Sequence, residues 1–202
     1  MAEEEEIVLT LASGNAHKAL EIAAMLPAGV RMQTLKEISW TKEIAETGRT
    51  FLENAGIKAH TVARETGRWV LADDSGLETE ALQGAPGVYS ARFAGEGAED
   101  ADNRKLLLDN MQHHSNRKAR FVAVLVLSNG IKDFVFEGIC EGSITTEERG
   151  AGGFGYDPVF IPQGHAQSFA EMPTEEKNKI SHRAMAMKAF VTWLVKHRHL
   201  LR

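Results

Sequence analysis

The feature that most constrains the fold is an alternation of short apolar runs with stretches of helical periodicity. The run Ile7–Ala12 is apolar and partly β-branched, which is typical of a buried strand, and the helical pattern after it ends before Pro27. Thr50 and Glu53 form a capping-box pattern that predicts the start of a second helix, which ends near Gly67. Strands and helices that alternate in this way predict an α/β fold.

The rest of the chain adds a hairpin to this alternation. Trp69–Ala72 indicates a buried strand that runs into the acidic segment after it, and Phe121–Leu127 and Phe134–Ile144 indicate two antiparallel strands joined by a turn at Asn129-Gly130. We expect glycine-rich loops at residues 83–97 and 150–162, a helix at Asp102–Met111 and a last helix that carries Met187 to Val195. The pattern therefore predicts a mixed sheet with helices packed on it.

Composition and charge exclude several classes of function. The net charge is −5, whereas a nucleic-acid-binding protein is expected to show a basic excess or a basic stripe. No apolar run approaches 18 residues, and the acidic stretch Glu3–Glu6 stands where a signal peptide would be basic and then apolar. The single cysteine, Cys140, allows no intrachain disulfide and suits a buried residue in a reducing compartment. We expect one domain over residues 1–202, located in the cytoplasm, that binds neither nucleic acid nor membrane.

The first polar motif, Ser13-Gly14-Asn15-Ala16-His17-Lys18, lies where the first strand gives way to the first helix. Backbone N–H groups at a helix start, together with a hydroxyl, an amide and a lysine, suit a phosphate group. The segment is not a Walker sequence. By itself it is equally explained as a turn with a helix cap.

Acidic residues form the second motif, Asp73-Asp74-Ser75-Gly76, at the expected carboxyl end of a buried strand, where ligands of α/β sheets bind. If the strand continues through them, Asp73 and Asp74 point in opposite directions, so that one can face the site while the other supports it. Such carboxylates can hold Mg²⁺, with Glu46 as a further ligand. The alternatives are a solvated turn for the two aspartates and an ordinary surface position for Glu46.

Aromatic and basic groups gather near the end of the chain. Phe154-Gly155-Tyr156-Asp157-Pro158 offers two rings in a glycine-rich loop, which can stack on a base or can pin the loop to the core. Lys177 and the segment Ser181-His182-Arg183 supply cations and hydrogen-bond donors, or form a polar entry to the last helix. Together with the phosphate and acidic motifs, these residues describe a nucleotide site.

These motifs, in this order, resemble the family of non-canonical purine nucleoside-triphosphate pyrophosphatases, the relatives of inosine triphosphate pyrophosphatase. The resemblance spans roughly residues 7–195 and rests on the segments Ser13–Lys18, Glu46–Ala55, Ala72–Leu77, Gly84–Arg92, Gly152–Pro158 and Ile180–Arg183. Six segments in family order are far more specific than any one of them. Some bacterial members carry two acids before Thr-Gly, where this chain has Ala45-Glu46.

The resemblance implies a homodimer with an elongated, twisted mixed sheet, flanking helices and two lobes around a central cleft. It implies Mg²⁺-dependent hydrolysis of ITP, dITP and XTP between the α- and β-phosphates, which gives a nucleoside monophosphate and pyrophosphate and cleanses the nucleotide pool. Asp74 would be the catalytic residue and, with Glu46, a metal ligand. The implied substrate-binding residues are Ser13, Gly14, Asn15, Ala16, His17, Lys18, Ser75, Phe154, Gly155, Tyr156, Asp157, Lys177, His182 and Arg183.

Donor chemistry predicts a preference for purines with a 6-keto group. Lys177 and Arg183 offer only donors, which a 6-keto oxygen accepts and the 6-amino group of adenine does not. Two other functions remain open at this point. The chain can be a pyrophosphatase for ordinary or pyrimidine nucleotides, or a nucleotide sensor without turnover.

Overall fold

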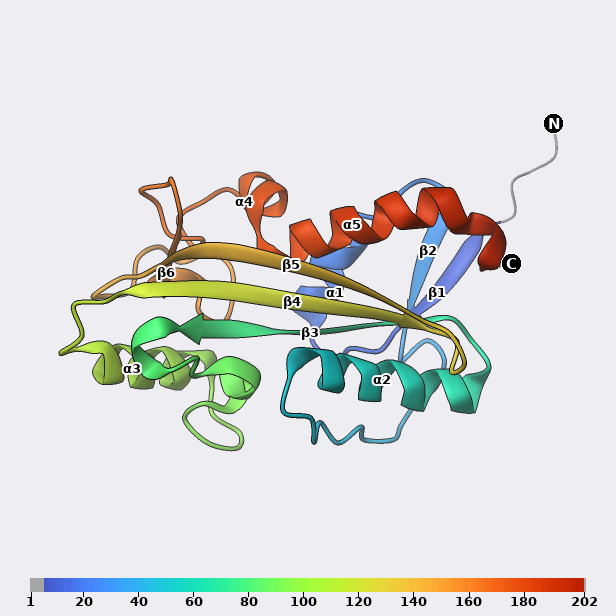
Figure 1. Cartoon of the computed structure of the whole chain (residues 1–202), viewed down its shortest axis with the longest axis horizontal. Coiled ribbons are helices and arrows are strands. Elements are labelled where there is room, and N and C mark those ends of the chain that lie inside the picture. Colours follow the sequence, from blue (N-terminus) through green and yellow to red (C-terminus); the bar gives the residue numbers. More distant parts are fainter. Residues whose placement is uncertain (1–5, 202) are drawn as a thin grey trace. The chain divides into compact units, whose positions relative to one another are not determined.

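The computed structural model describes residues 6–201, so of the acidic stretch Glu3–Glu6 only Glu6 lies within the described residues. Its strands and helices follow one another as β1 (Ile7–Leu11), α1 (Ala16–Ala24), β2 (Val30–Thr34), α2 (Phe51–Thr66), β3 (Val70–Thr79), α3 (Asp100–Met111), β4 (Lys118–Ser128), β5 (Asp133–Ile144), β6 (Phe160–Pro162), α4 (Thr174–Ile180) and α5 (His182–His197) (Figure 1). The six strands form one sheet in the order β2-β1-β3-β4-β5-β6. Since β1 is parallel to β2 and β3 while β6 is antiparallel to β5, the predicted mixed α/β fold is confirmed.

The chain divides into two compact units. Unit 1 consists of Met1–Asp74, Val124–Glu137 and Arg183–Arg202, and unit 2 consists of Ser75–Ala123 and Gly138–His182. Strands β3, β4 and β5 each contribute residues to both units. The boundary between the units falls within two of the sequence motifs. It lies between Asp74 and Ser75 in one and between His182 and Arg183 in the other.

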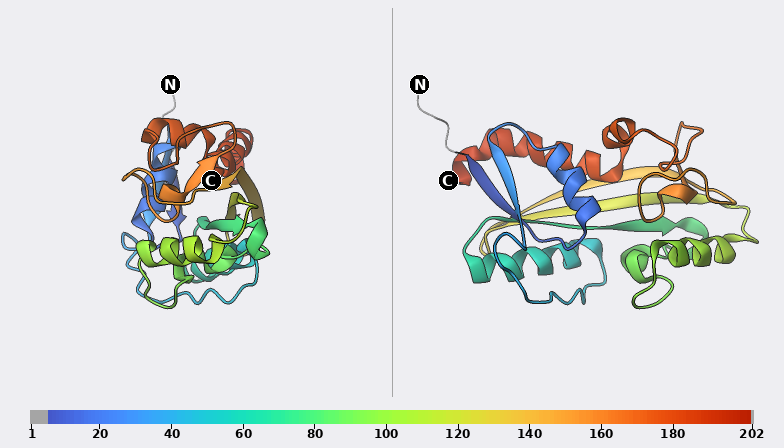
Figure 2. Two further views of the ribbon diagram at one scale, coloured as in Figure 1. Left: turned by 90° about the vertical axis from the view of Figure 1, so that its left-hand side faces the viewer. Right: turned by 180° about the vertical axis from the view of Figure 1, so that it is seen from behind.

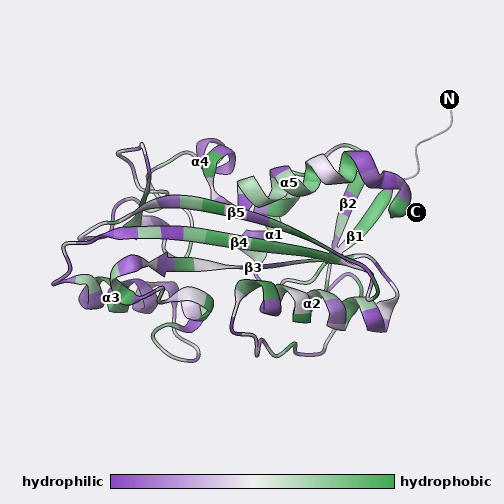
Figure 3. Cartoon of the chain, in the orientation of Figure 1, coloured by the Kyte–Doolittle hydropathy of each residue, from purple (hydrophilic) through white to green (hydrophobic). Residues whose placement is uncertain are grey.

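In unit 1, helices α2 and α5 lie on opposite faces of the sheet (Figures 1 and 2). Helix α5 packs against β5 through Phe190 and Phe136, whose ring centroids are 5.5 Å apart. Helix α2 begins with the predicted capping box of Thr50 and Glu53, and Gly67 ends it with a φ of 66°, a left-handed conformation that glycine adopts without strain. Figure 3 shows the hydrophobic colouring of β1 and of the middle of β4, which matches strands buried between helices.

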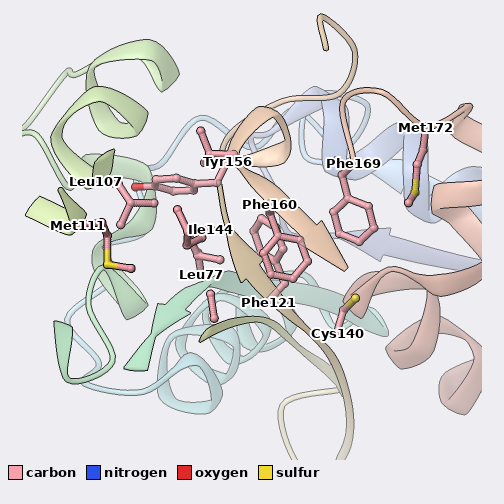
Figure 4. Close-up of a cluster of buried hydrophobic side chains, with 12 residues drawn as sticks. Leu77, Leu107, Met111, Phe121, Cys140, Ile144, Tyr156, Phe160, Phe169 and Met172 are labelled. Carbon is pink, nitrogen blue, oxygen red and sulfur yellow. The ribbon is translucent and has the colours of Figure 1, made fainter. Parts of the chain in front are cut away.

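Unit 2 has its own apolar core, which includes two residues of α3, Leu107 and Met111 (Figure 4). Phe121 on β4 contacts Phe160 on β6 edge-on, with ring centroids 4.7 Å apart. Cys140 is buried among these side chains, as predicted, and burial raises the pKa of its thiol to about 11.

Several predicted boundaries were wrong. The strand expected at Trp69–Ala72 continues to Thr79, so the acidic motif is part of β3 and not of a turn after it. The segment 150–162, expected as a loop, contains β6, and the segment 83–97 contains a 3₁₀ helix at Gly87–Arg92. We did not predict β2 or α4, and α5 begins at His182, earlier than expected.

Among the described residues, no helix is both long enough and apolar enough to cross a membrane.

Candidate active site

The two adjacent aspartates of β3 are both buried in unit 1, and they have different partners. Successive side chains of a strand point to opposite faces of a sheet, and the strand continues through both residues. Asp73 pairs with cations of α1 and α5, whereas Asp74 pairs with a cation of α2, the helix on the other face (Figure 1). This opposition is the one that the sequence pattern predicts for a continuous strand.

Asp73 is the centre of a buried ion network. Its Oδ1 accepts a hydrogen bond from Nζ of Lys18 at 2.8 Å, and its Oδ2 accepts one from Nε of Arg183 at 2.9 Å. The Arg183 side chain is only 1% exposed and also donates through Nη1 to Glu21 on α1. Burial would raise the pKa of Asp73, but Arg183 and Lys18 together hold it well below its usual range. Asp73 is therefore ionised throughout the neutral range and joins α1, β3 and α5.

Asp74 forms a second charged group with Lys58 of α2 and Glu46 of the loop before it. Nζ of Lys58 lies 2.9 Å from Oδ1 of Asp74 and 3.3 Å from Oε2 of Glu46. Burial raises the pKa of Asp74 to about 6, although Lys58 acts in the opposite direction. Burial also favours neutral Lys58, but the two carboxylates outweigh that effect and raise its pKa. A carboxyl group that titrates near neutrality is suited to proton transfer.

The oxygens of Asp74 and Glu46 suit a divalent cation, because they already converge on one cation, the Lys58 ammonium. Mg²⁺ commonly takes only one or two carboxylates from the protein and completes its octahedron with waters and substrate phosphates. Among the residues that the structure describes, no three His, Cys, Asp or Glu side chains gather as a ready-made metal site. The two carboxylates thus fit a divalent cation that completes its coordination with waters or phosphate oxygens.

The segment Ser13–Lys18 caps helix α1. The side chain of Asn15, the N-cap, accepts a hydrogen bond from the Lys18 amide at 3.1 Å, and the Ser13 hydroxyl accepts one from the Asn15 amide at 3.2 Å. Gly14, Ala16 and His17 are exposed. The helix cap that the sequence allowed is therefore present. The start of α1 is exposed, and Lys18 lies in the first turn of the same helix.

In unit 2, Asp157 and Lys177 form a buried ion pair beside Phe154. Nζ of Lys177, a side chain 5% exposed, donates to Oδ2 of Asp157 at 2.6 Å, and the same oxygen accepts the Phe154 amide at 2.9 Å. The ammonium of Lys177 also lies 4.8 Å from the ring centroid of Phe154, within the range of a cation–π interaction. Asp157 therefore fixes both the loop backbone and the cation next to the half-buried ring.

The other residues of this loop have structural contacts. The Tyr156 hydroxyl donates to the Ser90 carbonyl at 2.8 Å, so Tyr156 pins the loop to the core, as one of the two sequence interpretations expected. The Gly155 amide donates to Asp100 at 2.7 Å, and the Gly155 carbonyl accepts from Arg104 at 2.9 Å, which ties the loop to α3.

His182 and Arg183 are consecutive but belong to different surroundings. The ring of His182 stacks on Phe121 of unit 2 at a centroid distance of 4.6 Å and an angle of 9°. The donors Nε and Nη1 of Arg183 are directed to the carboxylates of Asp73 and Glu21 in unit 1. The structure thus groups Lys18 and Arg183 around Asp73, Glu46 with Asp74, and Phe154 and Lys177 with Asp157.

Sequence reasoning missed Lys58 and Glu21. Lys58 stands on the apolar stripe of α2, next to Ala55, Ala59 and Val62, and a lysine on the buried face of a helix is rarely found without a carboxylate partner. That position is the signal that could have identified Lys58. Glu21 lies between the exposed Leu20 and the buried Ile22 of α1 and gives no comparable signal.

Comparisons with known proteins identify the family of this chain. The model of the Ham1 family matches residues 9–193. A dITP/XTP pyrophosphatase of Bacillus licheniformis is 50% identical over 88% of this chain and 93% of its own length. A dITP/XTP pyrophosphatase of Christiangramia forsetii is 44% identical over 93% of this chain and 99% of its own length. The solved structure of a HAM1 protein from Coxiella burnetii matches with a TM-score of 0.87 at 40% identity and covers 94% of this chain and 99% of that one. The structure of the Staphylococcus aureus Ham1 protein matches with a TM-score of 0.86 at 36% identity and covers 94% of this chain and 98% of that one. The chain belongs to the Ham1 family.

Proposed function

We propose that this chain is a pyrophosphatase that hydrolyses the non-canonical purine nucleotides ITP, dITP and XTP to the nucleoside monophosphate and pyrophosphate. The observation that carries the proposal is the group of Asp74, Lys58 and Glu46, in which two carboxylates converge on one cation at a carboxyl group with a pKa of about 6. The related proteins named dITP/XTP pyrophosphatase, up to 50% identical to this chain, support the same substrate class.

We assign the phosphate chemistry to unit 1. Asp74 and Glu46 would hold Mg²⁺, which supplies charge neutralisation across the phosphate oxygens when it is bound. Lys18, at the start of α1, and the capping segment Ser13–His17 before it would bind the phosphates, which carry about four negative charges at neutral pH. Ser75, the residue after Asp74 on β3, is the first residue of unit 2, and its role in substrate binding rests on the resemblance to the family.

Asp74 would orient the attacking water and accept its proton. Without a bound cation, a carboxyl group with a pKa of about 6 is mostly ionised at neutral pH, so Asp74 can serve as a cation ligand and as a proton acceptor. The oxygen of that water forms a bond to phosphorus as the α–β anhydride bond breaks, and pyrophosphate leaves with the bonding electrons. The Lys58 ammonium, 2.9 Å from Asp74, would offset the negative charge of Asp74 beside the attacking water.

We assign base recognition to Phe154, Gly155, Tyr156, Asp157, Lys177 and His182. The resemblance adds Arg183 to this group, although its Nε and Nη1 donate to Asp73 and Glu21. Phe154 can stack on any base and so gives affinity without choice. Lys177, fixed by Asp157, presents only donors, which favours a 6-keto oxygen over the 6-amino group of adenine. Several mismatched polar groups together can reject the wrong analogue by about 10⁴-fold. A variant of Arg183 is a poor test of base selection, because removal of this side chain would also break the buried ion network around Asp73.

The test is a panel of ITP, XTP, GTP, ATP and pyrimidine triphosphates with Mg²⁺, from which kcat/KM is measured for each. We expect ITP and XTP to be good substrates and ATP to be poor. Equal values for ATP and ITP would show an ordinary nucleotide pyrophosphatase, and tight binding without turnover would show a sensor.

We also propose that both units form one nucleotide pyrophosphatase domain and that the protein is a cytoplasmic homodimer that binds neither nucleic acid nor membrane. The dimer rests on the resemblance to the family. Light scattering that gives the mass of a monomer at micromolar concentration would count against it.

A further inference from the structure

Asn54 is a fully buried amide on helix α2, and it ties the loop before that helix to the helix itself. Its Oδ1 accepts a hydrogen bond from the Gly48 amide at 2.8 Å. Its Nδ2 is also buried and, within residues 6–201, has no hydrogen-bond partner. An amide that is only half satisfied is a costly group to bury, so stability alone does not explain an asparagine at this position.

Gly48 fits this contact because it has no side chain. A Cβ atom at Gly48 would lie 2.7 Å from Oδ1 of Asn54 and 2.7 Å from Cβ of Glu53. The loop is therefore pressed against the first turn of α2. Glu53, which forms the capping box, accepts the amides of Arg49 and Thr50 and holds the following residues of the same loop.

The contact between Gly48 and Asn54 lies close in sequence to two members of the charged group around Asp74, Glu46 and Lys58. Glu46 stands two residues before Gly48, and Lys58 stands one helical turn after Asn54. The Glu46 side chain is 34% exposed, and its 3.3 Å ion pair with Lys58 is the weak kind of pair that does not hold a loop in place. The hydrogen bond from the Gly48 amide to the buried Asn54 side chain is better suited to fix where the Glu46 carboxylate lies.

We propose that Asn54 is a positioning residue, which acts through the Gly48 amide to hold Glu46 beside Lys58 and Asp74 as a cation ligand. This inference rests on the proposed function, because Asn54 can have this role only if Glu46 is a magnesium ligand. It concerns cation binding by the free protein and therefore has a readout that does not require turnover.

The experiment measures Mn²⁺ binding to the nucleotide-free protein by electron paramagnetic resonance in wild type, Asn54→Ala, Gly48→Ala and Glu46→Gln. We expect Asn54→Ala to weaken Mn²⁺ binding about tenfold or more, as removal of a group that orients a metal ligand typically does. Gly48→Ala, which breaks the same contact from the loop side, should have the same effect. It also serves in place of Asn54→Ala if that variant does not fold.

A double variant separates positioning from general damage. If Asn54 acts through Glu46, Asn54→Ala should cause no further loss of Mn²⁺ affinity in the Glu46→Gln background. Asn103→Ala is the matched control, because Asn103 is also a buried helical asparagine whose Oδ1 accepts a loop amide, that of Ala94 at 2.8 Å. It should lower the melting temperature and leave Mn²⁺ affinity unchanged.

Wild-type Mn²⁺ affinity in folded Asn54→Ala or Gly48→Ala would overturn the inference, as would an Asn54→Ala loss that adds in full to that of Glu46→Gln. Absence of Mn²⁺ binding by the wild type would overturn it as well. Pyrophosphate release from ITP by the wild type, measured in parallel, judges the proposed function separately, so failure of one is distinguishable from failure of the other.

Discussion

Replacement of Asp73 by asparagine should unfold this protein far more readily than the same replacement at Asp74. The Asp73 carboxylate lies within 3 Å of two cations, Lys18 and Arg183, and Arg183 is almost completely buried. Asp73→Asn removes a carboxylate that, together with Glu21, compensates the charge of Arg183. Loss of one partner of a buried ion pair costs about 3–5 kcal/mol, a large part of the roughly 5–15 kcal/mol that stabilises a typical domain.

The expected change can be followed by thermal melting. At about 2–4 °C per kcal/mol for a chain of this size, Asp73→Asn should lower Tm by about 6–20 °C. Asp74→Asn should lower Tm by less than Asp73→Asn does, because burial raises the pKa of Asp74 to about 6 and thus disfavours its charge in the folded state, and because Glu46 still lies 3.3 Å from Lys58 in the variant.

The pH dependence gives a second check with a defined sign. The folded-state pKa of Asp73 is lowered, so its contribution is present above the unfolded pKa of about 3.9 and is lost as the pH falls further. In the presence of a chelator, the Tm difference between wild type and Asp73→Asn should be constant from pH 5 to 8 and should shrink below pH 4. Equal Tm values for the two proteins at pH 7 would refute the reasoning.

Three further predictions concern chemistry. Asp74→Asn should bind nucleotide and fold as the wild type does but lower kcat by orders of magnitude; near-normal turnover would remove Asp74 from the catalytic role. Activity should require a divalent cation, with Mg²⁺ preferred, because Asp74 and Glu46 offer hard oxygen ligands, and activity that survives exhaustive chelation would contradict this. Cys140, whose pKa burial raises to about 11, should react slowly with a thiol reagent at pH 8 in the folded protein and rapidly in denaturant; equal rates would show that the thiol is accessible.

The sequence predicted best where local patterns and burial agree. The capping box at Thr50 and the end of the helix at Gly67 both lie where the pattern indicated, because each depends on residues that are close in the sequence. Strand β2 (Val30–Thr34) was missed because it has no apolar run, and its alternation of apolar and polar residues, Val30 to Gln33, is short and mostly half-buried.

The site shows the same division between local and distant contacts. Opposed directions for Asp73 and Asp74 follow from the strand geometry alone. The pairing of Arg183 with Asp73 joins residues 110 positions apart, so no local pattern could indicate that this arginine supports a carboxylate. Lys58 was missed for a related reason, since a helical pattern shows that its face is buried but does not show which carboxylates lie opposite.

The most direct test of the central claim is the identity of the products that the wild-type protein forms from ITP in the presence of Mg²⁺. Chromatography of the nucleotides, with separate detection of pyrophosphate and orthophosphate, gives the stoichiometry. Cleavage of the α–β anhydride predicts one IMP and one pyrophosphate for each ITP consumed, with no orthophosphate and no IDP. Release of orthophosphate with accumulation of IDP, or no consumption of ITP, would contradict the claim.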